Sequence, residues 1–166
     1  MPQIILFVEN AGDKIAVSDK IACYIAADTL PAAKIEELVS FKKMVLCCGE
    51  RALEVCKEHN LDGVVKEIDV KKPVKAQLKP LREALKKKTL GVIVPARRHE
   101  AMLAGEVEPE FIAFYPLENG HDVELLSWYN DLFLIPAAWV ADSREDLAAD
   151  VDFLIVKAKN FENFGC

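Results

Sequence analysis

The sequence predicts an α/β protein, a compact (β/α)₈ TIM barrel with shortened or missing helices. Residues Thr89–Pro116 hold a complete strand–helix–strand unit, with an apolar run at Leu90–Val94, an amphipathic stretch at Arg97–Ala104 and a second apolar run at Phe111–Phe114. Two buried strands joined by a helix run parallel, and a parallel sheet needs helices over its faces. The chain contains eight such apolar runs, the strand number of this barrel. Its 166 residues are too few for eight full helices, because about 250 residues is typical of the fold.

The eight apolar runs are short, as is typical of strands buried on both faces. They lie at Gln3–Val8, Ile21–Ala27, Lys43–Cys48, Gly63–Ile68, Leu90–Pro95, Glu110–Tyr115, Leu132–Ala137 and Asp152–Lys157. An open doubly wound sheet, which needs only five or six strands, is the alternative. The chain has neither of the glycine-rich phosphate-binding motifs that would support it.

Amphipathic stretches between these runs predict the helices. They lie at Pro31–Phe41, Glu50–His59, Pro80–Lys88, Arg97–Ala104, Val123–Asn130 and Ser143–Ala149. Pro80 is placed in the first turn of its helix, since proline inside a helix removes a hydrogen bond. Met102 is expected on the inner side of its helix. Asn10–Lys20 is too polar and too short for a helix, so we expect at most a turn there.

Composition predicts one domain over residues 1–166 and narrows the class of protein. A net charge of −6 argues against nucleic acid as a partner, because phosphate binding needs clustered Lys and Arg. The basic cluster Lys71–Lys88 is interpreted as a solvated helix flank. Ile4–Val8 is too short for a membrane span and lacks the basic flank of a signal peptide. Five cysteines without a C-x-x-C motif fit a reducing compartment, so we expect a cytoplasmic protein. We expect no membrane partner, and the sequence leaves open whether the chain forms a homo-oligomer.

Three segments, residues 51–64, 97–116 and 134–139, resemble the thiamine-phosphate synthase/TenI family. The segment RRHEAMLAGEVEPEFIAFYP, residues 97–116, is similar to that family's EA..AGE.GADY helix and the strand ending in FGP. Arg51–Val64 resembles its NDRADLA…GADGVHL segment, and Leu134–Trp139 resembles its IPVVAIGG strand. The resemblance covers residues 43–157 and lies more in spacing than in identity. It implies a TIM barrel that joins a pyrimidine pyrophosphate to a thiazole phosphate with Mg²⁺.

The family's functional positions are mostly replaced in this chain. The resemblance implies that Glu50 and Asp69 are the nearest equivalents of the family's metal ligands, and Glu50 can still offer an oxygen to Mg²⁺. The family's lysine loop is absent after Pro116, and Ala141-Asp142 stands where its phosphate-binding glycines would be. A carboxylate at Asp142 would repel a phosphate.

The residues expected at the C-terminal end of the barrel are therefore mixed in charge. Acids from five connections are expected at one rim: Glu9, Asp28, Glu50, Asp69 and Asp142. So many acids suit a cation or an amine better than a phosphate ester. Arg97, Arg98, Lys157 and Lys159 could offset some of this charge. Our ligand-binding candidates are Glu50, Asp69, Arg97, Arg98, Asp142 and Lys157.

Two functions follow as alternatives. In one, the chain is a divergent barrel that has lost the family's catalysis and binds an unknown small-molecule ligand or a partner. In the other, it is an active thiamine-phosphate synthase that uses Mg²⁺. The sequence assigns no catalytic residue. His59, His99 and His121 lie in three separate connections without metal-ligand spacing, and adjacent Cys47 and Cys48 are expected to pack on opposite faces of their strand.

Overall fold

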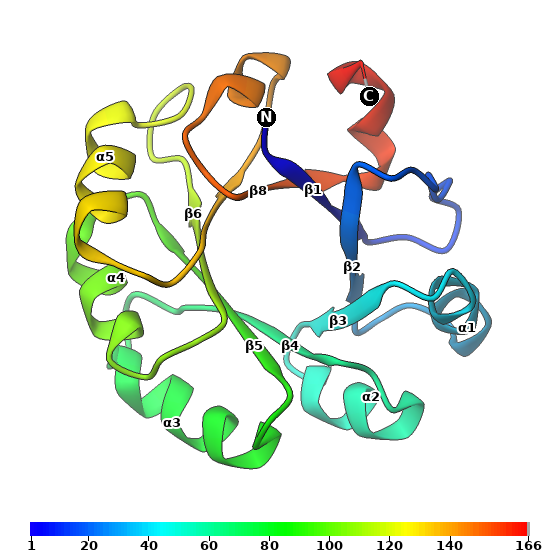
Figure 1. The fold of residues 1–166 in the computed structure, drawn as a ribbon. Helices are drawn as coiled ribbons and strands as arrows, with labels where there is room; N and C mark the ends of the chain where they lie inside the picture. The colour runs from blue at the N-terminus through cyan, green and yellow to red at the C-terminus, as the bar shows by residue number, and fades with distance from the viewer. Residues whose placement is uncertain (166) are drawn as a thin grey trace.

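The structure, a computed structural model that describes residues 1–165, is a closed barrel of eight parallel strands (Figure 1). The strands are β1 (Gln3–Val8), β2 (Ile21–Ala27), β3 (Met44–Cys48), β4 (Gly63–Glu67), β5 (Thr89–Pro95), β6 (Phe111–Tyr115), β7 (Ala137–Val140) and β8 (Phe153–Lys157). Neighbours in the barrel are neighbours in the chain, and β1 closes it by pairing with both β2 and β8. The predicted (β/α)₈ barrel is confirmed, and the open doubly wound sheet is wrong.

Helices alternate with the strands and surround the barrel (Figure 1). The α-helices are α1 (Ala32–Ser40), α2 (Ala52–His59), α3 (Val74–Leu85), α4 (Arg98–Gly105) and α5 (Val123–Leu132); the 3₁₀ helices are η1 (Arg144–Ala148) and η2 (Ala158–Phe164). Within residues 1–165, no helix has the length and apolar character needed to cross a membrane.

Strand side chains alternate between the barrel interior and the layer beneath the helices. Cys47 packs in the outer layer and Cys48 against the interior, as predicted. At the start of the strands the interior is filled by Phe111 and Phe153, whose ring centroids are 6.5 Å apart. Gly91 leaves room for them, because a Cβ atom there would lie 2.2 Å from the Phe111 ring. A ligand site is therefore to be sought at the opposite end, where the strands finish.

The connection between β1 and β2, residues 9–20, contains no helix, as predicted. The hydroxyl of Tyr24 donates a hydrogen bond to the Ala16 carbonyl at 2.9 Å, and Lys34 Nζ donates to the Asp13 carbonyl at 2.6 Å. These bonds tie the connection to β2 and α1. An ordered loop thus takes the place of the missing helix.

Seven of the eight predicted strands begin and end within one residue of those observed. The remaining prediction, for the seventh strand along the chain, is wrong. We expected it at Leu132–Ala137, whereas β7 begins at Ala137. The apolar residues before β7 end α5 and form the connection after it. Phe133 stacks on Tyr129 of α5 with ring centroids 4.5 Å apart, whereas Leu132 and Leu134 are largely exposed, so this run lies outside the sheet.

Two expectations about helices are also wrong. Helix α3 begins at Val74 and contains Pro80 in its interior, not in its first turn. Pro80 and the residue four before it, Ala76, are both exposed, so water can reach the carbonyl that loses its donor. Met102 is 55% exposed, because the inner face of α4 is made by Glu100, Ala101 and Ala104.

Candidate functional site

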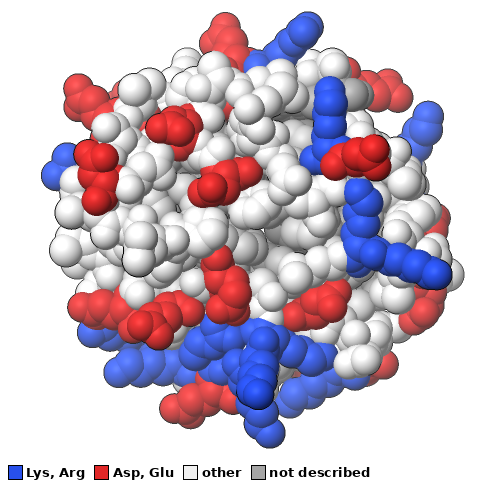
Figure 2. Space-filling view, in the orientation of Figure 1, with Lys and Arg blue, Asp and Glu red and all other residues white. Residues whose placement is uncertain are grey.

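The acids predicted for one rim do follow their strands at the C-terminal end of the barrel. Glu9 follows β1, Asp28 follows β2, Glu50 lies just beyond β3, Asp69 beyond β4 and Asp142 beyond β7. On the face of the molecule seen in Figure 2, Asp and Glu side chains are scattered; many Lys and Arg side chains gather along the edge where Figure 1 places α2 and α3, and others lie beside acids on the right-hand side. The five rim acids come from five different connections, each close after the end of its strand.

Glu50 and Asp69 lie in the walls of one cavity of about 340 Å³, which we call the Glu50–Asp69 cavity. Lys66, Lys72 and Glu67 share its lining, and Lys72 Nζ lies 4.0 Å from an Asp69 carboxylate oxygen. Within residues 1–165, no three His, Cys, Asp or Glu side chains are grouped so that they could hold a metal ion. The structure places the two predicted ligands in the walls of one cavity, but not in a group of three that could hold a metal ion.

Cys48 also lines the Glu50–Asp69 cavity. Burial raises the pKa of its thiol to about 11, and the nearby Glu67 carboxylate adds to the effect. The thiol is therefore protonated at neutral pH, which makes it a poor nucleophile. Its role is packing at the mouth of the barrel.

The cations predicted for ligand binding are engaged by neighbours in their own chain. Arg97 makes a two-pronged contact with Glu100, with both nitrogen–oxygen distances 2.6 Å, and this hydrogen bonding lowers the pKa of the buried Glu100 carboxyl. The Arg98 guanidinium lies 5.0 Å from the Trp128 ring centroid. Lys157 Nζ lies 3.5 Å from Glu9 Oε1. The charges of Arg97 and Lys157 are therefore partly offset by carboxylates of the same chain, which weakens their attraction for a phosphate.

Asp142 lies beside a second carboxylate. Its backbone N–H donates to Oδ2 of Asp146 at 3.0 Å, and Asp146 is fully buried. Partial burial raises the pKa of the Asp142 carboxyl, and the neighbouring Asp146 carboxyl raises it further. This part of the rim disfavours a further negative charge, so it does not suit a phosphate group.

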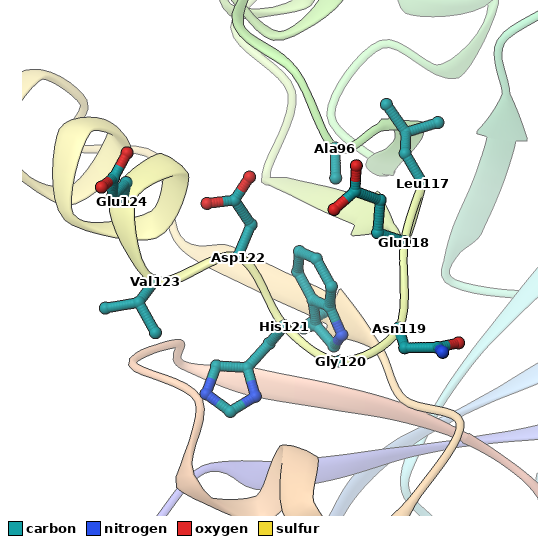
Figure 3. Close-up of a pocket in the computed structure, with 10 residues that line it drawn as sticks. Ala96, Leu117, Glu118, Asn119, Gly120, His121, Asp122, Val123 and Glu124 are labelled. Atoms are coloured by element: carbon teal, nitrogen blue, oxygen red, sulfur yellow. The ribbon is translucent and has the colours of Figure 1, made fainter.

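Sequence reasoning missed a cavity of about 420 Å³ formed by the connection between β6 and α5 (Figure 3). We call it the acid-lined cavity, and its lining residues are Ala96, Leu117, Glu118, Asn119, Gly120, His121, Asp122, Val123, Glu124 and Trp139. Three of them are carboxylates, and none of these described lining residues is Lys or Arg. The sequence signal for it is the polar segment directly after a barrel strand, which carries Glu118, Asp122 and Glu124.

The loop that forms the acid-lined cavity is anchored at both ends. The Asp122 carboxylate accepts the N–H of Leu125 at 3.0 Å and so caps α5. His121 Nδ1 lies 3.1 Å from Oδ1 of Asp146, and in Figure 3 the His121 ring turns away from Ala96 and Glu118. Asp146 is the third helical residue of η1, and with Ser143 it forms a capping box at the start of that helix. His121 therefore acts as an anchor for the cavity wall.

Two apolar side chains and one unusual polar group complete the cavity. Leu117 is 55% exposed and Val123 is 67% exposed, so the cavity is flanked by apolar surface in contact with solvent. The Trp139 side chain is fully buried, and its indole Nε1–H has no hydrogen-bond partner in the described part of the chain.

No protein-family model matches the sequence. A search of curated proteins likewise finds no match to it.

Proposed function

We propose that this chain is a divergent barrel of the thiamine-phosphate synthase/TenI type that has lost the family's catalysis and binds a small cationic ligand in the acid-lined cavity. The observation that carries the proposal is the lining of that cavity, with Glu118, Asp122 and Glu124 and without Lys or Arg among its described residues. Carboxylates gathered around a concave site attract cations and repel phosphates. The closed (β/α)₈ barrel supports a relation to the family at the level of fold alone.

The ligand we expect is an ammonium group attached to an apolar body. A cavity of about 420 Å³ is in the range of small-molecule sites. The exposed Leu117 and Val123 side chains offer apolar contact at its edge, while the carboxylates would bind the ammonium. An arylmethyl or alkyl ammonium ion fits this combination of apolar and acidic lining.

Benzylamine tests this proposal, with benzyl alcohol as a neutral probe of the same shape and phenylacetate as an anionic one. We expect benzylamine to bind and the other two to bind at least about tenfold more weakly, because an ion pair is replaced by a neutral or repulsive contact. Binding is followed by chemical-shift changes of backbone amides in the loop 117–124. Equal binding of all three probes, or of none, contradicts the proposal.

A charge-neutral variant locates the site. Glu118→Gln should lower the affinity for benzylamine by about two- to fivefold, since a partly exposed ion pair contributes up to about 1 kcal/mol to binding. Glu83→Gln on α3 is the matched control, because Glu83 is exposed and does not line the cavity. A similar loss in both variants would mean that general surface charge and not this cavity attracts the amine.

The second candidate function is an active synthase that uses Mg²⁺. It is favoured by one observation, the shared cavity of Glu50 and Asp69, which are the residues nearest to the family's metal ligands. These two carboxylates would hold the ion there, and a bound Mg²⁺ would supply positive charge that neutralises a departing pyrophosphate. The measurement that separates the two functions is turnover of the two thiamine precursors.

A further inference from the structure

Trp139 in β7 places a buried hydrogen-bond donor against the acid-lined cavity without giving it an acceptor. The side chain has no exposed surface, and within residues 1–165 Nε1 is one of two buried side-chain polar atoms without a hydrogen-bond partner. The other atom is Glu9 Oε1, which has the Lys157 ammonium 3.5 Å away. Native proteins pair nearly all such groups, because an unpaired buried donor has lost its hydrogen bonds to water without compensation. This N–H therefore calls for an explanation.

None of residues 1–165 accepts a hydrogen bond from this N–H. The Trp139 ring lies edge-on to the His121 ring, with the two ring centroids 6.5 Å apart. His121 Nδ1 is already engaged by Asp146. Trp139 lines the acid-lined cavity, and a molecule bound there would reach the covered Nε1–H once the loop residues over the indole move aside.

We propose that the ligand of the acid-lined cavity carries an uncharged hydrogen-bond acceptor that pairs with the Trp139 indole N–H. This inference rests on the proposed function and narrows its ligand class. The acceptor is uncharged, because Glu118, Asp122 and Glu124 line the same space and would repel an anion. The ligand is then a small ammonium compound whose apolar body bears a heteroaromatic nitrogen, a carbonyl or an ether oxygen.

The three aminomethylpyridine isomers and benzylamine form a matched set of probes. All carry the same ammonium group on a six-membered aromatic ring, and the pyridines differ from benzylamine by one neutral ring nitrogen at pH 8. We expect at least one isomer to bind about fivefold more tightly than benzylamine, as one additional hydrogen bond provides. Trp139→Phe keeps an aromatic ring in the core and should abolish that preference.

The wild-type protein gives an independent readout if Trp139→Phe does not fold. The chain has two tryptophans, so its spectrum has two indole N–H resonances, and Trp128 is an internal control. On addition of the preferred aminomethylpyridine, the Trp139 indole proton should move downfield, as hydrogen bonding requires. Benzylamine should leave it nearly unchanged, and the Trp128 resonance should respond equally to both probes.

The outcomes separate this inference from the proposed function. If benzylamine and all three pyridines bind equally and the Trp139 resonance moves equally, the amine site stands and the acceptor inference is wrong; water is then the partner of the indole. If none of the four amines binds, both are wrong. Preference for a pyridine that persists in Trp139→Phe also overturns the inference, because the acceptor must then pair elsewhere.

Discussion

The Nδ1 atom of His121 lies 3.1 Å from Oδ1 of Asp146, and this contact joins the connection after β6 to η1. The other oxygen of Asp146 accepts the backbone N–H groups of Asp142 at 3.0 Å and Ser143 at 3.4 Å. Asp146 is fully buried and depends on these donors for the stability of its charge. One wall of the acid-lined cavity is thus held by a carboxylate that does not line it.

Asp146→Ala should lower the free energy of unfolding by about 2–4 kcal/mol. The substitution leaves two backbone N–H groups and the His121 ring without their acceptor in a buried position. Urea unfolding followed by circular dichroism measures the change. Asp150→Ala is the control in the same connection, since Asp150 is exposed, and it should stay within about 0.5 kcal/mol of wild type. Equal stability of the two variants would mean that the Asp146 contacts contribute nothing.

Asp142→Asn should raise stability at neutral pH and have no such effect in acid. The pKa of the Asp142 carboxyl is raised in the folded protein by burial and by Asp146. A raised carboxyl pKa means that the folded state binds the proton more tightly, so the stability cost of ionisation builds up as the pH rises from the unfolded pKa to the folded pKa and is complete above the folded value. Below the unfolded value of 3.8 the carboxyl is protonated in both states, and the cost disappears.

Unfolding free energies of wild type and Asp142→Asn at a series of pH values test this sign. The gap between the two curves should widen as the pH rises from below 3.8 and then become constant. A gap that is largest in acid would reverse the assignment and would mean that the Asp142 carboxylate is stabilised by the fold.

The strands were predictable because burial on both faces leaves a strong local signal, as in Leu90–Val94. The facing of α4 was not, since Ala101, Met102 and Ala104 are all apolar and the correct inner face includes a charged residue, Glu100. Glu100 can be buried because Arg97 pairs with its carboxylate. Sequence spacing alone does not show that Glu100, and not Met102, takes the buried position on α4.

Met102→Asp and Ala101→Asp form a matched pair on α4 that tests this facing. Ala101 is fully buried and Met102 is 55% exposed. A carboxylate at position 101 would be buried without a partner, so we expect a loss of about 3 kcal/mol or more, whereas Met102→Asp should cost less than about 1 kcal/mol. Melting temperatures of the two variants decide it. A larger loss for Met102→Asp would contradict the observed orientation of the helix.

The candidate site was less predictable than the fold, for a physical reason. Asp69 and Glu50 were found from local similarity, and the barrel does bring them to one cavity. The role of Trp139 was not predictable, because an aromatic residue in a strand is ordinarily part of the core. That its indole N–H lacks an acceptor depends on which groups surround it in the folded protein. The pairing of His121 with Asp146 spans 25 residues and depends on where two loops meet.

The last prediction is that the protein does not make thiamine phosphate at a useful rate. Departure of pyrophosphate is accelerated by cations that stabilise the charge developing in the transition state. Here the lysine loop is absent after Pro116, and Arg97, Arg98 and Lys157 are each engaged by a neighbouring side chain. Removal of one such contact commonly costs about two to three orders of magnitude in rate.

Turnover of the pyrimidine pyrophosphate and the thiazole phosphate at saturating Mg²⁺ is the measurement. Asp142→Gly removes one repulsive charge but should restore little, because the other missing contacts act on the same transition state and their effects are not independent. Glu83→Gln, with its charge change on α3, controls for the altered net charge. A wild-type rate on the order of one per second, ordinary for an enzyme, would establish the active synthase instead. In that case Glu50→Gln and Asp69→Asn should each abolish most of the Mg²⁺-dependent rate, since both line the cavity where the ion would be held.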